Sequence, residues 1–455
     1  MDQRSPFEIP NRYRRAFGWR VSTPQRQSES TVTNALIGLS ASELPDTLED
    51  FLDLTRRRRK NKAALSKIQL WMLQEIVFQE AVVRRCKKRL EELGMDSAAE
   101  EVGSPEVVAI KREMFIFRTY ANAIRSIGDG LAWRAFGYDR AVLRLMCGQA
   151  TKQQVVSEGL MGELPEWSIR FDSGDGVAIL NSLTNCLAIG DVTVVRDDGS
   201  AEVVEVKSSN TKSRRKIRQK RGMSEVATLL SAGEGSTEDK DVKIEILPIK
   251  PEAGLDRLAI LLSKAEENGW ASAKISNCLY IECLDFEKFQ DVESVSLAIK
   301  EVEATREATI GDWERRHDLV IQRNSLDLMA FSPNCAPFSI FPFPSRICVD
   351  LMIGKKSYVG YLNVNAVARE FEHRGWRIAK TPEQLVREGN DQAIIVVQKG
   401  ALHVGVPPAD FMRMHMEVLR PQTLISSCEA KLKEGPDGES GYLLTLYEGE
   451  PDLWD

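Results

Sequence analysis

Two acidic residues and a lysine stand close together in this sequence, separated by a short loop. Asp191 precedes the β-branched run Val192–Val195, and a second run ends with Glu205, Val206 and Lys207. Two carboxylates that face each other repel, and a divalent cation with oxygen ligands relieves that repulsion. Such a cation activates water for hydrolysis, and a neighbouring lysine offsets the charge of the transition state.

The loop between the two runs decides whether these side chains share one face of a β-hairpin. A two-residue turn sets Asp191 opposite Val206, whereas a three-residue loop with Gly199 in a bulge sets Asp191 opposite Glu205. A slip of one residue moves every side chain of a strand to the other face. Only the odd-length loop gathers Asp191, Glu205 and Lys207 on one side, so we predict that register.

The acids and the lysine in this hairpin setting resemble the PD-(D/E)xK nuclease superfamily, over residues 151–250. The resemblance implies an α/β core of the αβββαβ restriction-endonuclease type. It also implies that Asp191, Glu205 and the backbone carbonyl of Val206 bind Mg²⁺ or Mn²⁺, with Lys207 assisting the attacking water. The family's Asp often follows a proline, and Gly190 stands here instead.

A basic helix follows the hairpin. Ser213 is a good N-cap, and Gln219 begins a stripe that continues with Met223 and Val226 at helical spacing. Many family members carry a glutamine in this helix near the metal, so the resemblance implies that Gln219 orients groups of the site.

Seven basic side chains of this helical segment form a candidate phosphate-binding surface. They are Lys212, Arg214, Arg215, Lys216, Arg218, Lys220 and Arg221. The net charge of the chain is −6, so binding to nucleic acid has to come from such a local patch. The simpler alternative is a solvated helix face beside two strand acids that pair with Lys207 or an arginine.

Family members often carry a further acid on the helix before the first strand. Asp129 is the first candidate, because Gly128 and Gly130 indicate a close backbone contact there, although a plain turn also explains them. Glu158, on an expected helix directly before the sheet, is the second candidate, and Glu163 is also considered.

The pattern of the chain divides it into four regions. Residues 1–30 are polar and basic and are expected to form a flexible arm. Residues 31–145 predict an α-helical hairpin or coiled coil, and residues 146–250 hold the nuclease-like core. Residues 251–455 predict a separate α+β domain of unknown role.

The helical region has clear boundary signals. Gly94 ends one predicted helix, Ser104 and Pro105 begin the next, and residues 128–130 predict an interruption. Basic runs, including residues 84–89, suit a clamp on nucleic acid. A structural arm with a solvated basic face, which binds a partner protein or a second copy of the chain, explains them slightly better.

Composition excludes several classes of protein. Hydrophobic residues make up 43% and charged residues 28% of the 455 positions, as in ordinary soluble globular proteins. The 8 cysteines include no C-x-x-C pair, which speaks against structural zinc and suits a reducing cytoplasm. No apolar run is long enough to span a membrane, and the N-terminus lacks the apolar segment of a signal peptide. No motor or redox fingerprint is present.

We therefore expect a cytoplasmic, magnesium-dependent nuclease that hydrolyses phosphodiester bonds, with DNA as its substrate. Its unfamiliar flanking regions suggest, by analogy, a bacterial defence effector. The alternative is a catalytically inactive nuclease-like module that binds nucleic acid or protein. A third reading is a helical scaffold whose role is assembly.

Overall fold

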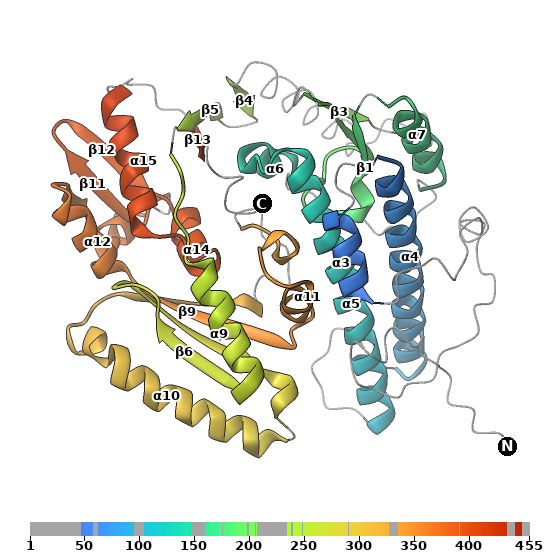
Figure 1. Ribbon diagram of the computed structural model, residues 1–455, viewed down its shortest axis with the longest axis horizontal. Helices are drawn as coiled ribbons and strands as arrows, with labels where there is room; N and C mark the ends of the chain where they lie inside the picture. Colours follow the sequence, from blue (N-terminus) through green and yellow to red (C-terminus); the bar gives the residue numbers. More distant parts are fainter. Residues whose placement is uncertain are drawn as a thin grey trace. The chain divides into compact units, whose positions relative to one another are not determined.

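The computed structural model describes fourteen stretches of the chain. They are residues 47–57, 62–94, 104–147, 160–174, 176–197, 200–204, 206, 234–237, 240–247, 249–289, 291–326, 335–390, 392–434 and 442–447. These stretches form two compact units, one within Met1–Gly137 and Leu145–Ser231, the other within Tyr138–Arg144 and Ala232–Asp455. Figure 1 labels the elements of both. The fold mixes helices with mainly antiparallel sheets, and is α/β in this general sense.

Two long helices, α4 and α5, dominate unit 1 and pack against each other as an antiparallel hairpin. The helices of this region are α3 (Leu48–Arg57), α4 (Lys62–Glu92) and α5 (Pro105–Ala135). The predicted boundary signals are confirmed. Gly94 has a φ of 71°, and the Ser104 hydroxyl accepts a hydrogen bond from the Val107 N–H.

The predicted interruption at residues 128–130 is wrong, because α5 runs through it without a break. The glycines serve close packing instead. A Cβ on Gly128 would lie 2.1 Å from the carbonyl oxygen of Leu183, in the segment after strand β1. The small residue therefore lets the loop of the neighbouring sheet rest directly on the helix.

The sheet of unit 1 has three antiparallel strands in the order β1-β2-β3. Its elements are α7 (Leu160–Asp172), β1 (Val177–Leu180), the 3₁₀ turn η2 (Asn181–Leu183), β2 (Val192–Val195) and β3 (Ala201–Val204). Helix α7 packs on β1 and β2. At the outer edge of β1, the Gln69 side chain of α4 donates to the Ala178 carbonyl (2.9 Å) and accepts from the Leu180 N–H (3.0 Å).

The register of the β2–β3 hairpin confirms the odd-length loop. Val192 pairs with Val204, and the Arg196 N–H donates to the Ser200 carbonyl at 2.8 Å. The three residues between Arg196 and Ser200 therefore make the connection. This is the register that the placement of Asp191 required.

Unit 2 contains a four-stranded antiparallel sheet in the order β6-β7-β9-β8. Its strands are β6 (Trp270–Lys274), β7 (Leu279–Asp285), β8 (Val320–Asn324) and β9 (Lys356–Asn363). The helices of this part are α9 (Leu255–Asn268), α10 (Val292–Arg315), α11 (Ser345–Ile353) and α12 (Val364–His373), with 3₁₀ turns η3 (Phe286–Lys288) and η5 (Phe338–Ile340).

Two further three-stranded sheets belong to unit 2, in the orders β10-β11-β12 and β13-β5-β4. The strands are β4 (Glu234–Thr237), β5 (Lys240–Leu247), β10 (Arg377–Lys380), β11 (Ile395–Lys399), β12 (Leu402–Val406) and β13 (Tyr442–Tyr447). The helices are α13 (Pro382–Arg387), α14 (Pro408–Met416) and α15 (Pro421–Glu434), while α6 (Arg140–Cys147) crosses the boundary between units.

Strand β5 pairs with β4 and, in parallel, with β13, so it belongs to a different sheet from β1, β2 and β3. The described strands therefore do not form the complete αβββαβ sheet that the resemblance implies.

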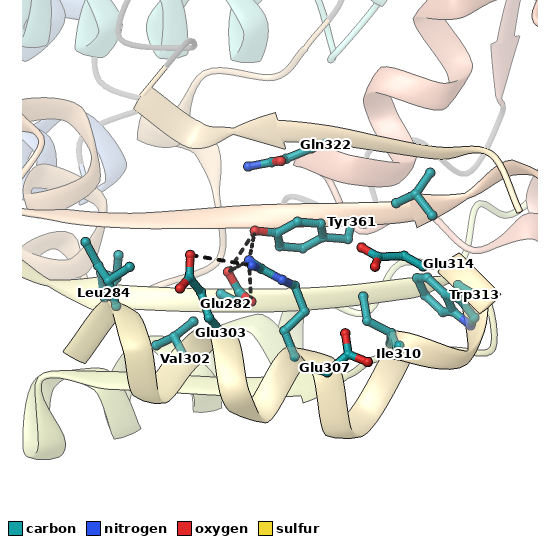
Figure 2. A pocket seen from close by; sticks show the side chains of 14 residues that line it. Glu282, Leu284, Val302, Glu303, Glu307, Ile310, Trp313, Glu314, Gln322 and Tyr361 are labelled. Carbon is teal, nitrogen blue, oxygen red and sulfur yellow. Dashed lines mark hydrogen bonds and ion pairs between the residues drawn. The ribbon is translucent and has the colours of Figure 1, made fainter. Parts of the chain in front are cut away.

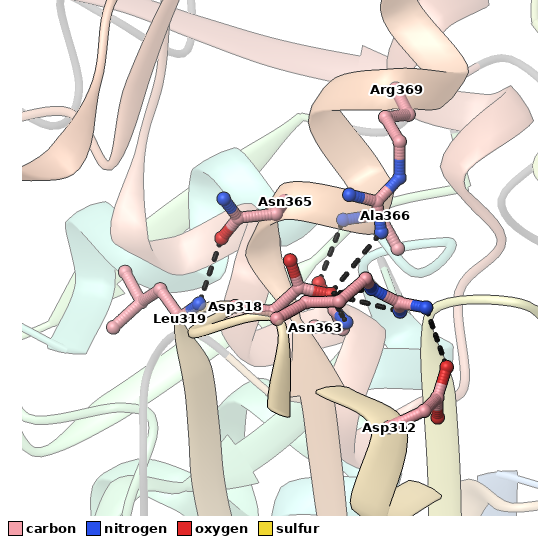
Figure 3. Close-up of polar contacts among 8 residues, drawn as sticks. Asp312, Asp318, Leu319, Asn363, Asn365, Ala366 and Arg369 are labelled. Carbon is pink, nitrogen blue, oxygen red and sulfur yellow. Dashed lines mark hydrogen bonds and ion pairs between the residues drawn. The ribbon is translucent and has the colours of Figure 1, made fainter. Parts of the chain in front are cut away.

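One carboxylate, Asp318, fixes the end of α10 to the start of α12, as Figure 3 shows. It accepts hydrogen bonds from Asn363 (2.8 Å), Arg369 (3.3 Å) and Arg316 (3.0 Å). Burial acts to raise the pKa of Asp318, but these donors together lower it below its ordinary value. Because three side chains of the fold bond the same carboxylate oxygen, Oδ2, Asp318 has a structural role.

Candidate active site

Asp191 lies at the start of the central strand of the unit 1 sheet. Its N–H donates to the Val204 carbonyl at 2.9 Å, and its carbonyl accepts from the Asn181 N–H at 3.0 Å. Gly190 before it has a φ of 75°, and a Cβ there would lie 2.4 Å from Val203. Proline, whose φ is fixed near −65°, cannot adopt this conformation, which explains the departure from the family pattern.

The Asp191 carboxylate points along the sheet toward the end of β3. Its Oδ2 accepts a hydrogen bond from the backbone N–H of Val206 at 2.7 Å. This bond spans 15 residues of sequence and brings the acid to the segment that carries the Glu-x-Lys motif. Asp191 and Val206 are thus brought together, as the predicted site requires.

Several predicted site residues lie outside the part of the chain that the structure describes. They are Glu205, Lys207, Gln219, Glu158 and the basic residues Lys212, Arg214, Arg215, Lys216, Arg218, Lys220 and Arg221.

Glu163 of α7 is near enough to Asp191 for the two charges to interact. Its side chain is buried, and burial, followed by the negative charge of Asp191, raises its pKa to about 7. The nearby Ser182 acts in the opposite direction. Glu163 was among the residues considered for a further acid. Asp129 and Glu158 ranked ahead of it; the available signal was a helix before β1 that continues to Asp172.

Asp129, the first candidate for that acid, holds the connection between β1 and β2. Its carboxylate accepts hydrogen bonds from the Asn185 N–H (2.6 Å), the Asn185 side-chain amide (2.8 Å) and the Cys186 N–H (2.8 Å). Burial raises the pKa of Asp129, and these donors oppose the rise. The structure therefore gives Asp129 the role of positioning the loop that leads to Asp191.

A second positioning contact, which sequence reasoning missed, lies next to Asp191. The Asn181 side chain accepts from the Thr193 hydroxyl at 2.8 Å and donates to the Ile189 carbonyl at 2.8 Å. These bonds tie the end of β1 to the residues on both sides of Asp191. A threonine within a run of valines was the available signal.

The donor chemistry of this region fits a hard divalent cation. Carboxylates of Glu163 and Asp191 and the backbone oxygen of Val206 are all oxygen ligands, the type that Mg²⁺ and Mn²⁺ take. Within the described stretches, no group of three or more His, Cys, Asp or Glu side chains could hold a metal ion. A third carboxylate would have to come from Glu205, which those stretches do not include.

Unit 2 contains a different cavity, of about 450 Å³, between α10 and its four-stranded sheet (Figure 2). Arg306 crosses it, bonding the hydroxyl of Tyr361 at 2.5 Å and the buried carboxylate of Glu282 at 3.3 Å. Its guanidinium lies 5.0 Å from the Tyr361 ring centroid. Three further acids line the cavity: Glu303, Glu307 and Glu314. Four carboxylates around one internally paired arginine would repel a phosphodiester, so this cavity is a poor nucleic-acid site.

Comparisons with family models, with curated proteins and with solved structures found no match to this chain. Within the part of the chain that is described, no helix has the length and apolar character to cross a membrane.

Proposed function

We propose that the protein is a metal-dependent nuclease that hydrolyses phosphodiester bonds in nucleic acid, with DNA as the substrate. The observation that carries the proposal is the 2.7 Å hydrogen bond from the Val206 N–H to the Asp191 carboxylate. It supports a site in which Asp191 lies beside the Glu205–Lys207 segment. The acid pair of Glu163 and Asp191 supports it independently, because the charge of one raises the pKa of the other.

In this proposal Glu163, Asp191, Glu205 and the Val206 carbonyl hold Mg²⁺ or Mn²⁺. The bound cation supplies an activated water and stabilises the leaving oxygen of the phosphodiester. Glu163 has a pKa of about 7, so it can release its proton at neutral pH when a cation takes its place.

The chain's other groups position substrate and charge. Lys207 donates to the attacking water and offsets negative charge in the transition state, while Gln219 orients the carboxylates. The seven basic residues between Lys212 and Arg221 contact phosphates on either side of the bond to be cut. Asn181 and Asp129 keep Asp191 in place through the β1–β2 connection.

Cleavage of plasmid DNA by the purified protein tests this proposal. We expect cutting with Mg²⁺ that EDTA abolishes and that Asp191→Asn reduces by about 100-fold or more, because the variant loses a charged ligand of the cation. Asp197→Asn, the same change in the exposed loop of the same hairpin, is the matched control and should cut normally. Equal cleavage by Asp191→Asn and wild type would contradict the assignment. DNA binding without any cutting would instead favour an inactive nucleic-acid-binding module.

A further inference from the structure

We propose that the exposed side of the α4–α5 hairpin binds the backbone of nucleic acid and holds the substrate of the unit 1 site. The inference rests on the proposed function for the identity of the ligand as DNA. The surface, here called the hairpin patch, consists of Arg84, Arg85, Lys88 and Arg89 of α4 and Val108, Arg112, Phe115 and Arg118 of α5.

The α5 part of the hairpin patch is an exposed stripe in which apolar and basic residues alternate. Val108, Arg112, Phe115 and Arg118 follow one another at spacings of three or four, so they share one helix face. The Phe115 side chain is 63% exposed and Val108 is 48% exposed. An aromatic ring this exposed, between two arginines, does not belong to the core of the hairpin. It is suited to stacking on a base.

The α4 part brings further positive charge to the same place. The antiparallel packing of the helices sets Phe78 against Phe117, with ring centroids 6.2 Å apart. Arg89 of α4 bonds Glu106 of α5 at 2.9 Å. The basic end of α4 therefore lies beside the N-terminal part of α5, which carries Val108 and Arg112.

Basic residues outnumber acids on this part of the hairpin. Residues 84–92 contain five Lys or Arg and two acids, and residues 106–118 contain three Lys or Arg and two acids. Glu106 pairs with Arg89 at 2.9 Å, and burial raises the pKa of Glu113 to about 7. The hairpin patch is thus locally positive on a chain whose net charge is −6.

This charge decides between a nucleic acid and a second copy of the chain as the occupant. A symmetric dimer through the patch would bring identical positive surfaces together, and they would repel. A polyanion with exposed bases matches both the arginines and Phe115.

The hairpin also sets the distance between the patch and the candidate active site. Gln69 bonds β1, and Arg84–Arg89 lie 15 to 20 residues farther along α4, which is roughly 22–30 Å at the helical rise. On α5, Arg112–Arg118 lie 10 to 16 residues from Gly128, or roughly 15–24 Å. In Figure 1 both helices run away from β1. At 3.4 Å per base pair, a bound duplex would extend about 5–9 base pairs from the sheet.

Fluorescence anisotropy with a 20-nucleotide DNA strand and with its duplex, both in EDTA, measures binding without cleavage. We expect Arg84→Glu/Lys88→Glu/Arg118→Glu to bind both DNAs at least about 10-fold more weakly, with a shallower salt dependence. Phe115→Ala should weaken binding of the single strand by about 5-fold or more, and binding of the duplex by less. The matched control, Lys264→Glu/Lys300→Glu/Arg387→Glu, reverses the charge of three exposed basic side chains of unit 2. It should bind both DNAs as tightly as wild type does.

A folded triple variant, judged by circular dichroism, that binds both DNAs as tightly as wild type would overturn the inference. So would a Phe115→Ala variant that changes the oligomeric state but not DNA binding, because that result assigns the surface to a protein contact. The outcome is separable from the proposed function. If the triple variant loses binding and wild type never cuts, the patch stands and the nuclease proposal fails. If wild type cuts and the triple variant binds normally, the reverse holds.

Discussion

Buried Glu163 of unit 1 and the carboxylates around Lys356 of unit 2 differ in the charge of their neighbours. In unit 1, the neighbour that acts most strongly on the charge of buried Glu163 is another acid, Asp191. In unit 2, three carboxylates surround the ammonium group of Lys356, which is 1% exposed. The two arrangements have similar side chains but different consequences for what each region can bind.

In the unit 2 cluster, one buried lysine neutralises the surrounding carboxylates. Lys356 bonds Asp350 of α11 and lies 3.5 Å from Asp285 and 3.6 Å from Glu266. Asp285 is its direct partner in the β7–β9 ladder. Burial acts to lower the pKa of Lys356, but the hydrogen bond and the three charges together raise it. The lysine therefore remains an ammonium ion and serves as the internal counter-ion.

The comparison teaches how to tell structural acids from ligand-binding ones. Carboxylates that surround a buried lysine are already neutralised by its ammonium group. Carboxylates that raise one another's pKa are in a higher-energy state, and an external cation lowers their energy. On this criterion the pair of Glu163 and Asp191 suits the external cation of the proposed function, and the cluster around Lys356 does not.

The largest effect is expected when the counter-ion of the unit 2 acids, Lys356, is removed. Lys356→Met leaves three acids without their counter-ion in a buried position. We therefore expect it to lower the free energy of unfolding by about 3–5 kcal/mol, measured by urea denaturation. Lys355→Met is the matched control. Lys355 bonds the half-exposed Glu287 at 2.6 Å, and its loss should cost about 1 kcal/mol or less. Equal losses for the two variants would contradict the assignment of Lys356 as the counter-ion.

A smaller effect distinguishes the units by their response to Mg²⁺. At Mg²⁺ concentrations 100-fold above the Kd, the wild-type protein should gain about 2.7 kcal/mol of stability, seen as a higher Tm. The gain should shrink in Glu163→Gln, which removes a ligand, and persist in Asp350→Asn, which alters only unit 2. A Mg²⁺ response lost in the unit 2 variant and kept in the unit 1 variant would reverse the comparison.

The smallest effect is a pH dependence without metal. The pKa of Glu163 is raised in the folded state, to about 7 from an ordinary 4.5. Its stabilising contribution is therefore complete below pH 4.5 and is lost as the pH rises through 7. We therefore compare the free energy of unfolding of Glu163→Gln with that of wild type in EDTA. The difference should shift in favour of the variant by about 1–2 kcal/mol between pH 5 and pH 8.

The control for this pH effect is Glu166→Gln on the same helix, where Glu166 bonds Arg170 at 2.8 Å. Urea unfolding at both pH values provides the measurement. A pH profile of Glu163→Gln identical to that of wild type would show that Glu163 is not the group responsible.

Local signals in the sequence were sufficient for part of the fold. The cap at Ser104, the left-handed Gly94 and the loop length around Gly199 each depend on a few neighbouring residues, and all three predictions are confirmed. Other segments were ambiguous: the apolar run at residues 347–353 suits a buried strand by its composition, but it belongs to helix α11, Ser345–Ile353. A continuous apolar run has no periodicity that separates a buried strand from a buried helix.

Contacts between distant segments could not be predicted. Gln69 bonds a strand 109 residues away, and Asp129 holds a loop 56 residues away. The residues next to Gln69 and Asp129 in the sequence do not indicate which distant segment each side chain bonds. The choice among Asp129, Glu158 and Glu163 likewise depended on how α5 and α7 pack on the sheet, which is a property of the tertiary structure.

The amide of Gln69 has one further consequence. It bonds the Ala178 carbonyl and the Leu180 N–H, two backbone groups at the edge of β1 that could otherwise pair with another strand. A shortened protein that begins after the helical hairpin would expose this edge and invite self-association. The helical hairpin therefore protects the edge of the sheet as well as packing against it.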